Sequence, residues 1–392
     1  MEPEHKTNFE QFLYAAIGSQ LVWFAPDLKA CQLVRMGSKD FASNIQYIWP
    51  SDNGTTIYLA LSDGGPGITG SQHHLLACSI DRSSGSIHEM GAYKTVPFRP
   101  IHLCLDKIGS HILTAYNNPS ALTAHKINED GSIGSETTRK DDKEVGIFGH
   151  QIMISPDGKT ALLVCRGYDA DDTNDERPGS LEIFSYGNGL LHHEKSIKPG
   201  KGYGFGARHL DFHRNAKWLY LAVERQSELC TFGIHKGKVS DTPLHRTTTL
   251  SQQMKAGIRQ AASAVHLSPS GKFVYVSNRT YRSSEDLSEK TVPAGEDNIA
   301  VFKIDENSGN PTPIQHANTE GSLPRTFSIH KSGKMLVAAN SEATTKINTS
   351  GTPKDLPLSL IVFEIQTNGK LQKKQKIEFS QTNKLLFWSG FL

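Results

Sequence analysis

Cysteine is scarce in this chain, and the spacing of its few cysteines argues against both a cysteine-ligated metal protein and a disulfide-stabilised one. Five cysteines stand singly among 392 residues, an odd number without the short spacings of a metal site or the pairs of a disulfide framework. We interpret them as buried free thiols, which predicts a reducing, cytoplasmic compartment. No signal peptide and no apolar run long enough to span a bilayer is recognisable, so we expect no membrane partner.

An excess of charge of one sign is also lacking. The chain has 42 basic and 40 acidic residues, for a formal net charge of +2. A nucleic-acid-binding protein normally carries a basic face or stripe, and this chain has neither. We therefore expect no nucleic-acid partner. No cofactor motif is present either, and we predict that the protein uses no cofactor.

Glycine and proline are plentiful, with 34 and 18 residues, and they punctuate a segment that recurs along the chain. Its clearest copy is GARHLDFHRNAKWLYLAVER from Gly206, which is typical of two strands joined by a polar turn. Further copies begin at Pro100, Gly149, Ser263 and Pro324, and a weaker one begins at Asn44.

The spacing of these copies predicts the fold. Their turns are centred on residues 54, 109, 158, 216, 271 and 333, a period of about 50–60 residues that fits four antiparallel strands per repeat. Three strand-like runs from Gln11 and the final run KLLFWSGFL would complete a seventh sheet and close the ring. We predict an all-β, seven-bladed β-propeller formed by one domain, 1–392, with residues 1–10 as a loose tail.

Three long polar stretches interrupt the period, at Tyr168 to Ser180, Tyr281 to Asp297 and Ser341 to Pro357. Each follows the second strand of a hairpin, so all three should project from the same face. Such loops commonly form the walls of a pocket. The alternative is that they are insertions exposed to solvent.

The hairpin geometry also selects candidate functional residues. Positions just before the first strand and just after the second share one face, and they hold His102, His150, Arg208, Arg325, Glu224 and Arg279. Arg208 and Glu224 each stand eight residues from the turn residue Ala216, so the hairpin should bring them together. His266 lies further along a first strand and should line the central channel. Singly, each could be an ordinary charge at a strand end, but their convergence on one axis indicates a functional site.

The segments GARHLDFHRN, HLSPSGKFVYVSNRT, HQIMISPDGKT and LPRTFSIHKSGK resemble the lactonase family of seven-bladed β-propellers. The family includes propeller-type 6-phosphogluconolactonases and the fungal carboxy-cis,cis-muconate lactonizing enzyme. The resemblance extends from Gln11 to Lys376. It implies an active site of one histidine, two arginines and one glutamate, which fall on His150, Arg208, Arg279 and Glu224.

These residue types suit hydrolysis of a sugar lactone. Glu224, oriented by Arg208, would be the base that activates water, and His150 would be the acid. Arg208 and Arg279 would stabilise the oxyanion and hold an anionic group of the substrate. We expect the remaining substrate-binding residues to be His102, Lys201, His266 and Arg325, with no metal.

Three alternatives remain open at this stage. The same residues could cyclise a muconate, a dicarboxylate substrate, into a lactone. A metal-dependent lactonase would need more oxygen ligands than Glu224, for which Asn117, Asn278 and Asn340 are the candidates. A binding propeller without catalysis is the third alternative, because fold does not decide function.

Overall fold

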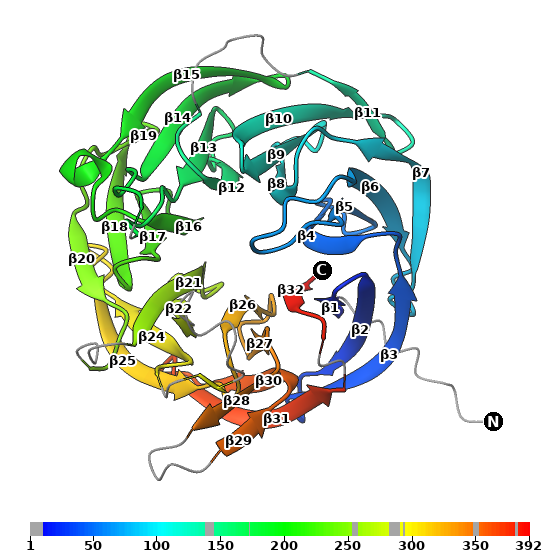
Figure 1. The fold of residues 1–392 in the computed structure, drawn as a ribbon, viewed down its shortest axis with the longest axis vertical. Coiled ribbons are helices and arrows are strands. Elements are labelled where there is room, and N and C mark those ends of the chain that lie inside the picture. Colours follow the sequence, from blue (N-terminus) through cyan, green and yellow to red (C-terminus); the bar gives the residue numbers. More distant parts are fainter. Residues whose placement is uncertain are drawn as a thin grey trace.

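A computed structural model of the protein describes residues 11–137, 145–171, 173–252, 258–281, 291–292, 295–347, 353–380 and 383–392. In these residues, seven sheets stand around a central axis like the blades of a propeller (Figure 1). The predicted seven-bladed, all-β ring is confirmed. The predicted tail, 1–10, lies outside the described residues.

Blades 1 to 3 each contain a predicted hairpin followed by an outer pair of strands. Their strands are β4 (Asn44–Pro50), β5 (Thr56–Ser62), β6 (His73–Ile80) and β7 (Ile87–Thr95); β8 (Pro100–Leu105), β9 (His111–Asn117), β10 (Ser120–Ile127) and β11 (Ile133–Glu136); and β12 (Gly149–Ile154), β13 (Thr160–Cys165), β14 (Ser180–Gly187) and β15 (Leu190–Ile197). The first strand of each blade lies nearest the axis (Figure 1).

Blades 4 to 6 repeat this order, and in blade 4 both β19 and β20 pair with β18. Their strands are β16 (Ala207–Phe212), β17 (Trp218–Val223), β18 (Glu228–His235), β19 (Lys238–Val239) and β20 (His245–Thr248); β21 (Arg259–Leu267), β22 (Phe273–Tyr281), β24 (Asn298–Ile304) and β25 (Pro311–Asn318); and β26 (Pro324–Ile329), β27 (Met335–Asn340), β30 (Leu358–Ile365) and β31 (Leu371–Phe379). A short 3-10 helix, η1 (Pro199–Gly202), precedes blade 4.

Blade 7 closes the ring with strands from both ends of the chain, as predicted. It consists of β1 (Leu13–Ile17), β2 (Gln20–Asp27), β3 (Gln32–Asp40) and the innermost strand β32 (Leu386–Phe391), which runs antiparallel to β1. The C-terminus therefore lies close to the axis (Figure 1). The closing blade covers one apolar face of blade 1 and one of blade 6.

The core is divided among the interfaces between blades. Seven clusters of buried apolar side chains each join two neighbouring blades, and two of them pack on the two faces of blade 7. Tyrosines on the second strand from the axis add hydrogen bonds between neighbouring blades. Tyr220, for example, is fully buried and donates a hydrogen bond of 2.8 Å to the carbonyl of Gly309 in the next blade. Tyr14, Tyr58 and Tyr275 make the same kind of bond to Gly85, Gly131 and Gly369.

Two of the predicted long loops contribute to an additional small sheet outside the blades. It consists of β23 (Thr291–Val292), β28 (Thr344–Ile347) and β29 (Pro353–Leu356), with β23 parallel to β28. All five cysteines are buried and free, in agreement with the prediction. Within the part of the chain that the structure describes, no helix is long and apolar enough to cross a membrane.

Candidate active site

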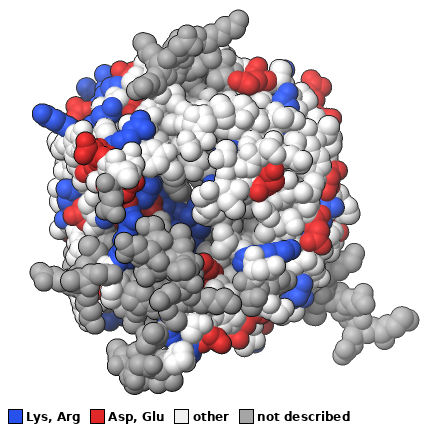
Figure 2. All heavy atoms as spheres, in the orientation of Figure 1, with Lys and Arg blue, Asp and Glu red and all other residues white. Residues whose placement is uncertain are grey.

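A cavity of about 380 Å³ opens at the end of the central channel where the innermost strands begin. Figure 2 shows basic residues inside the hollow on this face of the molecule. Its described lining consists of Gly65, Pro66, Gly67, Ile68, Thr69, Arg99, Ile101, Asn117, Asn118, Phe148, His150, Arg166, Tyr168, Glu224, Arg279, Tyr281, Arg325 and Phe387. The face predicted from the hairpin geometry is thus the face that carries the cavity.

A recurring β-bulge explains which side chains reach this end of the channel. The register of the innermost strand shifts just after its first residues in blades 1 to 6, so one or two residues there have no partner on the second strand. In blades 3, 4 and 6 the bulged residues are His150, Arg208 and Arg325. A bulge bends the strand and redirects a side chain, which is how three of the predicted residues are turned towards the site.

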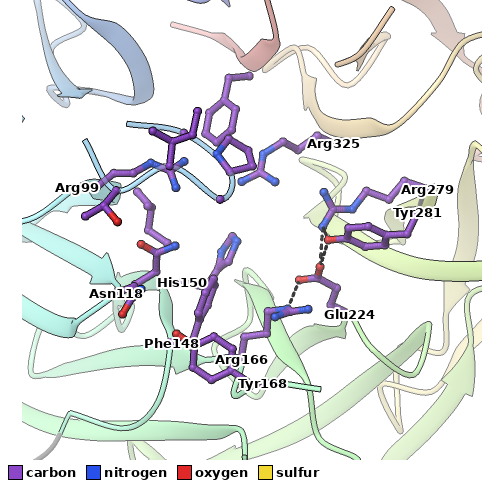
Figure 3. A pocket seen from close by; sticks show the side chains of 18 residues that line it. Arg99, Asn118, Phe148, His150, Arg166, Tyr168, Glu224, Arg279, Tyr281 and Arg325 are labelled. Carbon is purple, nitrogen blue, oxygen red and sulfur yellow. Dashed lines mark hydrogen bonds and ion pairs between the residues drawn. The ribbon is translucent and has the colours of Figure 1, made fainter. Parts of the chain in front are cut away.

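Glu224 stands at the centre of a buried ionic cluster. Its Oε1 accepts hydrogen bonds from Arg279 Nη2 at 2.7 Å and from the Tyr281 hydroxyl at 2.5 Å. Its Oε2 lies 3.2 Å from Arg166 Nε and 3.3 Å from Arg208 Nε. Dashed lines in Figure 3 mark the contacts with Arg166, Arg279 and Tyr281. One carboxylate is therefore shared by three guanidinium groups and a phenol.

This environment decides the protonation state of Glu224. Burial alone would raise the pKa of its carboxyl group, but the positive charges of Arg166, Arg279 and Arg208 and the hydrogen bond from Tyr281 outweigh it and hold the pKa well below its ordinary range. Both carboxylate oxygens of Glu224 face donors from the arginines and Tyr281, so neither is left to accept a proton from water. The geometry thus gives Glu224 the chemistry of a counter-charge.

Arg208 stabilises this cluster from behind the cavity wall. Its side chain is only 1% exposed, and it is absent from the cavity lining. Burial and the neighbouring charge of Arg279 lower the pKa of Arg208 to about 9, so it remains a cation at neutral pH. The hairpin prediction that pairs Arg208 with Glu224 is confirmed by their 3.3 Å contact.

Among the described residues that line the cavity, His150 is the neutral side chain with a nitrogen that can accept a proton. Figure 3 shows it projecting towards the centre of the cavity. Burial, followed by the positive charges of Arg208, Arg325, Arg279 and Arg166, lowers its pKa well below 6.5. The imidazole is consequently neutral at pH 7 and carries a free lone pair on one ring nitrogen, which can accept a proton.

The cavity as a whole carries an excess of positive charge. Four of its described lining residues are arginines (Arg99, Arg166, Arg279 and Arg325), and Glu224 is the one carboxylate among them, which leaves three positive charges in excess. Such a cavity favours an anionic ligand. Within the described part of the chain, no group of three or more His, Cys, Asp and Glu side chains could hold a metal ion.

Three other predicted substrate-binding residues lie away from this cavity. His102 is fully buried deeper in the channel, with its ring 4.0 Å from that of Tyr47. It follows the bulged residue Ile101, and this shift of one position directs it along the channel. His266 lines a second cavity at the opposite mouth of the channel, and Lys201 is exposed in η1.

Three functional candidates lie outside the predicted set. Arg166 follows β13 as Glu224 follows β17, so an alignment of the repeats could have identified it. Tyr281 comes two residues after Arg279, and Arg99 precedes β8 directly. Tyr168 and Tyr281, from two of the long loops, line the cavity, whereas no described residue of 341–357 does.

Comparison with known proteins identifies the family of the chain. The family described as "Lactonase, 7-bladed beta-propeller" matches residues 15–352. The 6-phosphogluconolactonase of Bacillus subtilis is 24% identical over 309 residues, which are 76% of this chain and 78% of that protein.

Solved structures show the same fold. A protein of Lactobacillus plantarum has a TM-score of 0.74 at 21% identity, with 98% of this chain and 99% of that chain covered. The periplasmic gluconolactonase of Pseudomonas aeruginosa has a TM-score of 0.71 at 17% identity, with 97% and 99% covered.

Proposed function

Because the chain belongs to the lactonase family of seven-bladed β-propellers, we propose that it hydrolyses an anionic sugar lactone, in the manner of a 6-phosphogluconolactonase. The observation that carries this proposal is a neutral histidine, His150, in one cavity with the guanidinium groups of Arg166 and Arg279. Lactone hydrolysis needs a base for water and positive charge for the oxyanion, and these residues supply both.

We assign the steps as follows. His150 removes a proton from a water molecule while the water oxygen attacks the lactone carbonyl carbon. The carbonyl oxygen becomes an oxyanion, and Arg166 and Arg279 stabilise it. The tetrahedral intermediate then collapses with cleavage of the ring C–O bond, and protonated His150 returns its proton to the departing alkoxide. The product is the open-chain hydroxy acid.

This assignment changes the role given to Glu224 by sequence reasoning. In the proposed mechanism Glu224 fixes Arg166 and Arg279 in place, and Arg208 acts as a positioning residue that supports Glu224 and keeps His150 neutral. The carboxylate is engaged by three guanidinium groups, so it has little capacity to bind a cation. The proposal is therefore a metal-independent reaction.

A small substrate panel tests the proposal. Hydrolysis of 6-phosphoglucono-δ-lactone and glucono-δ-lactone, and cyclisation of 3-carboxy-cis,cis-muconate, would be measured for the wild type, His150→Gln and Glu224→Gln, with and without chelator. Spontaneous hydrolysis is subtracted from every rate. We expect turnover of a sugar lactone that resists chelator and is lost in His150→Gln.

Two results would contradict the proposal. Turnover of the muconate alone would indicate a lactone-forming cyclase. The absence of turnover with any of the three substrates, for a protein whose folding is verified by circular dichroism, would favour a binding propeller.

A further inference from the structure

Two arginines of the cavity are set apart from the ionic cluster of Glu224. Arg99 and Arg325 contact no carboxylate within the described residues, whereas Arg166 and Arg279 are both paired with Glu224. In Figure 3, Arg99 and Glu224 lie on opposite sides of His150. The positive charge of the cavity is therefore unevenly paired: Arg166 and Arg279 share the carboxylate of Glu224, whereas Arg99 and Arg325 have no carboxylate partner among the described residues.

The two unpaired guanidinium groups share one aromatic support. Phe387, from β32, lies with its ring centroid 5.5 Å from the guanidinium carbon of Arg99 and 4.3 Å from that of Arg325. Stacking on an aromatic ring fixes the plane of a guanidinium and leaves its edge free for hydrogen bonds. One ring thus holds two cations at the same place in the cavity.

Arg99 is also held by a buried hydrogen bond. Its Nε donates to Gln46 Oε1 at 2.9 Å, and Gln46 is itself anchored to the carbonyl of Gly64 at 3.3 Å. Gln46 is the bulged residue of blade 1, so the backbone frame that positions His150 also positions Arg99. Only 8% of Arg99 is exposed, yet it lines the cavity with its terminal nitrogens unpaired in the described part of the protein.

Burying two uncompensated cations is costly unless a ligand supplies the missing negative charge. Burial lowers the pKa of Arg99 to about 10, which reflects this cost, and Arg99 remains charged at neutral pH. Arginine pairs bind phosphate oxygens through several parallel hydrogen bonds. A phosphate monoester, with close to two negative charges, would neutralise both groups.

We propose that Arg99 and Arg325 form a phosphate subsite, supported by Phe387, that selects a phosphorylated sugar lactone and orients its carbonyl towards His150. In a 6-phosphorylated δ-lactone, C5 carries the phosphorylated C6 and is joined to the carbonyl carbon through the ring oxygen. A phosphate held by Arg99 and Arg325 would therefore keep the carbonyl a few bonds away in the same cavity, where His150 projects. This inference rests on the proposed lactonase function and adds the residues that determine its specificity.

The test compares two substrates that differ only in the phosphate. For Arg99→Gln and Arg325→Gln, kcat/KM is measured with 6-phosphoglucono-δ-lactone and with glucono-δ-lactone. Each variant should reduce kcat/KM for the phosphorylated lactone about 10- to 100-fold, the value of one lost charged hydrogen bond, and reduce it less for the other. Arg35→Gln, an exposed arginine of the outer strand β3, is the matched control and should change neither value.

Equal losses on both substrates, or no loss on either, would overturn the phosphate subsite while leaving the lactonase proposal intact.

If the wild type hydrolyses neither lactone, the lactonase proposal fails, and the subsite is tested by titration with inorganic phosphate. Phosphate should then raise the melting temperature of the wild type and of Arg35→Gln, but not that of Arg325→Gln. The same increase in all three proteins would refute the subsite. Because the side chain of Arg325 makes no hydrogen bond within the described residues, Arg325→Gln is the variant expected to fold if Arg99→Gln does not.

Discussion

Replacing Glu224 by glutamine should destabilise the protein strongly, because Glu224 is the counter-charge of three guanidinium groups. Its Oε1 accepts hydrogen bonds from Arg279 and Tyr281, and its Oε2 forms ion pairs with Arg166 and Arg208. In glutamine, an amide nitrogen takes the place of one carboxylate oxygen. At that position its N–H groups would face the N–H or O–H donors of the neighbouring side chains, and no hydrogen bond could form. The three positive charges would also lose their compensation.

The size of the effect follows from the burial of Glu224, which is 2% exposed. Removing one partner of a buried ion pair costs about 3–5 kcal/mol. For 392 residues, an unfolding entropy of about 2.1 cal/mol/K per residue sums to about 0.8 kcal/mol/K, so the melting temperature should fall by about 4–6 °C. The matched control is Glu378→Gln, which breaks an exposed pair with Lys376 and should cost about 1 kcal/mol or less.

The pH dependence of this difference provides the stricter assay. The folded-state pKa of Glu224 lies below its ordinary value of 4.5, so its stabilising contribution is complete above pH 4.5 and is lost as the pH falls through the folded-state pKa. Melting curves of the wild type and Glu224→Gln should differ by a constant amount from about pH 6 to 8 and converge in acid. A difference no larger than that of Glu378→Gln, or one that grows as the pH falls, would refute the counter-charge role.

The remaining predictions concern proton transfer and the packing between blades. His150→Gln should reduce kcat by about 10²- to 10⁴-fold with little change in melting temperature, which steady-state kinetics and thermal melts will check together. Neutral His150 is the active form, so kcat/KM should fall as the pH drops through its pKa; Arg208→Gln removes a charge that lowers this pKa, and the acid limb of the profile should therefore move to higher pH. An unmoved acid limb would contradict the link between the two residues. Tyr220→Phe deprives the buried carbonyl of Gly309 of its donor and should cost about 1–3 kcal/mol in urea unfolding without changing kcat/KM.

The fold could be predicted from the sequence because each blade repeats one local pattern. Turn residues and alternating apolar strands recur at every copy, and a copy is a unit that can bury its faces only against its neighbours. The closure by β1 and β32 was accessible for the same reason, since the unmatched runs at the two ends complete one blade. The sheet formed by β23, β28 and β29 was not accessible, because it lies in the insertions, where the period gives no information.

Only those site residues that lie at the ends of strands could be predicted from the sequence. His150, Glu224, Arg279 and Arg325 all line the cavity, as their positions indicated. His102 does not line the cavity, although its neighbour Ile101 does. The difference is a single residue, because the position of the bulge cannot be recognised from the sequence of one hairpin. When Pro100 is aligned with Gly149, Ala207 and Pro324, His102 corresponds to Gln151 and the bulged position is Ile101.

The protonation of Glu224 could not be predicted from the hairpin at all. Arg208 comes from the same hairpin, but Arg166 comes from blade 3, and Arg279 and Tyr281 come from blade 5. The charge state of one carboxylate therefore depends on three neighbouring blades together. A strand-end glutamate with a single arginine partner would retain more basicity than Glu224 has here.

The recurring β-bulges let the side chains of the site vary while the backbone that positions them stays the same. The bulged residues of blades 2, 3 and 6, which are Ile101, His150 and Arg325, line the cavity, and that of blade 1, Gln46, bonds to Arg99 in its wall. A substitution at one such position changes the charge or shape of the cavity and leaves the backbone hydrogen bonds of the blade unchanged. Gln46 and Phe387 contribute through their hold on Arg99, although neither carries a charge. Specificity for an anionic group can therefore change through residues that never touch the reacting carbonyl, and the phosphorylated and unphosphorylated lactones are the substrates that will reveal it.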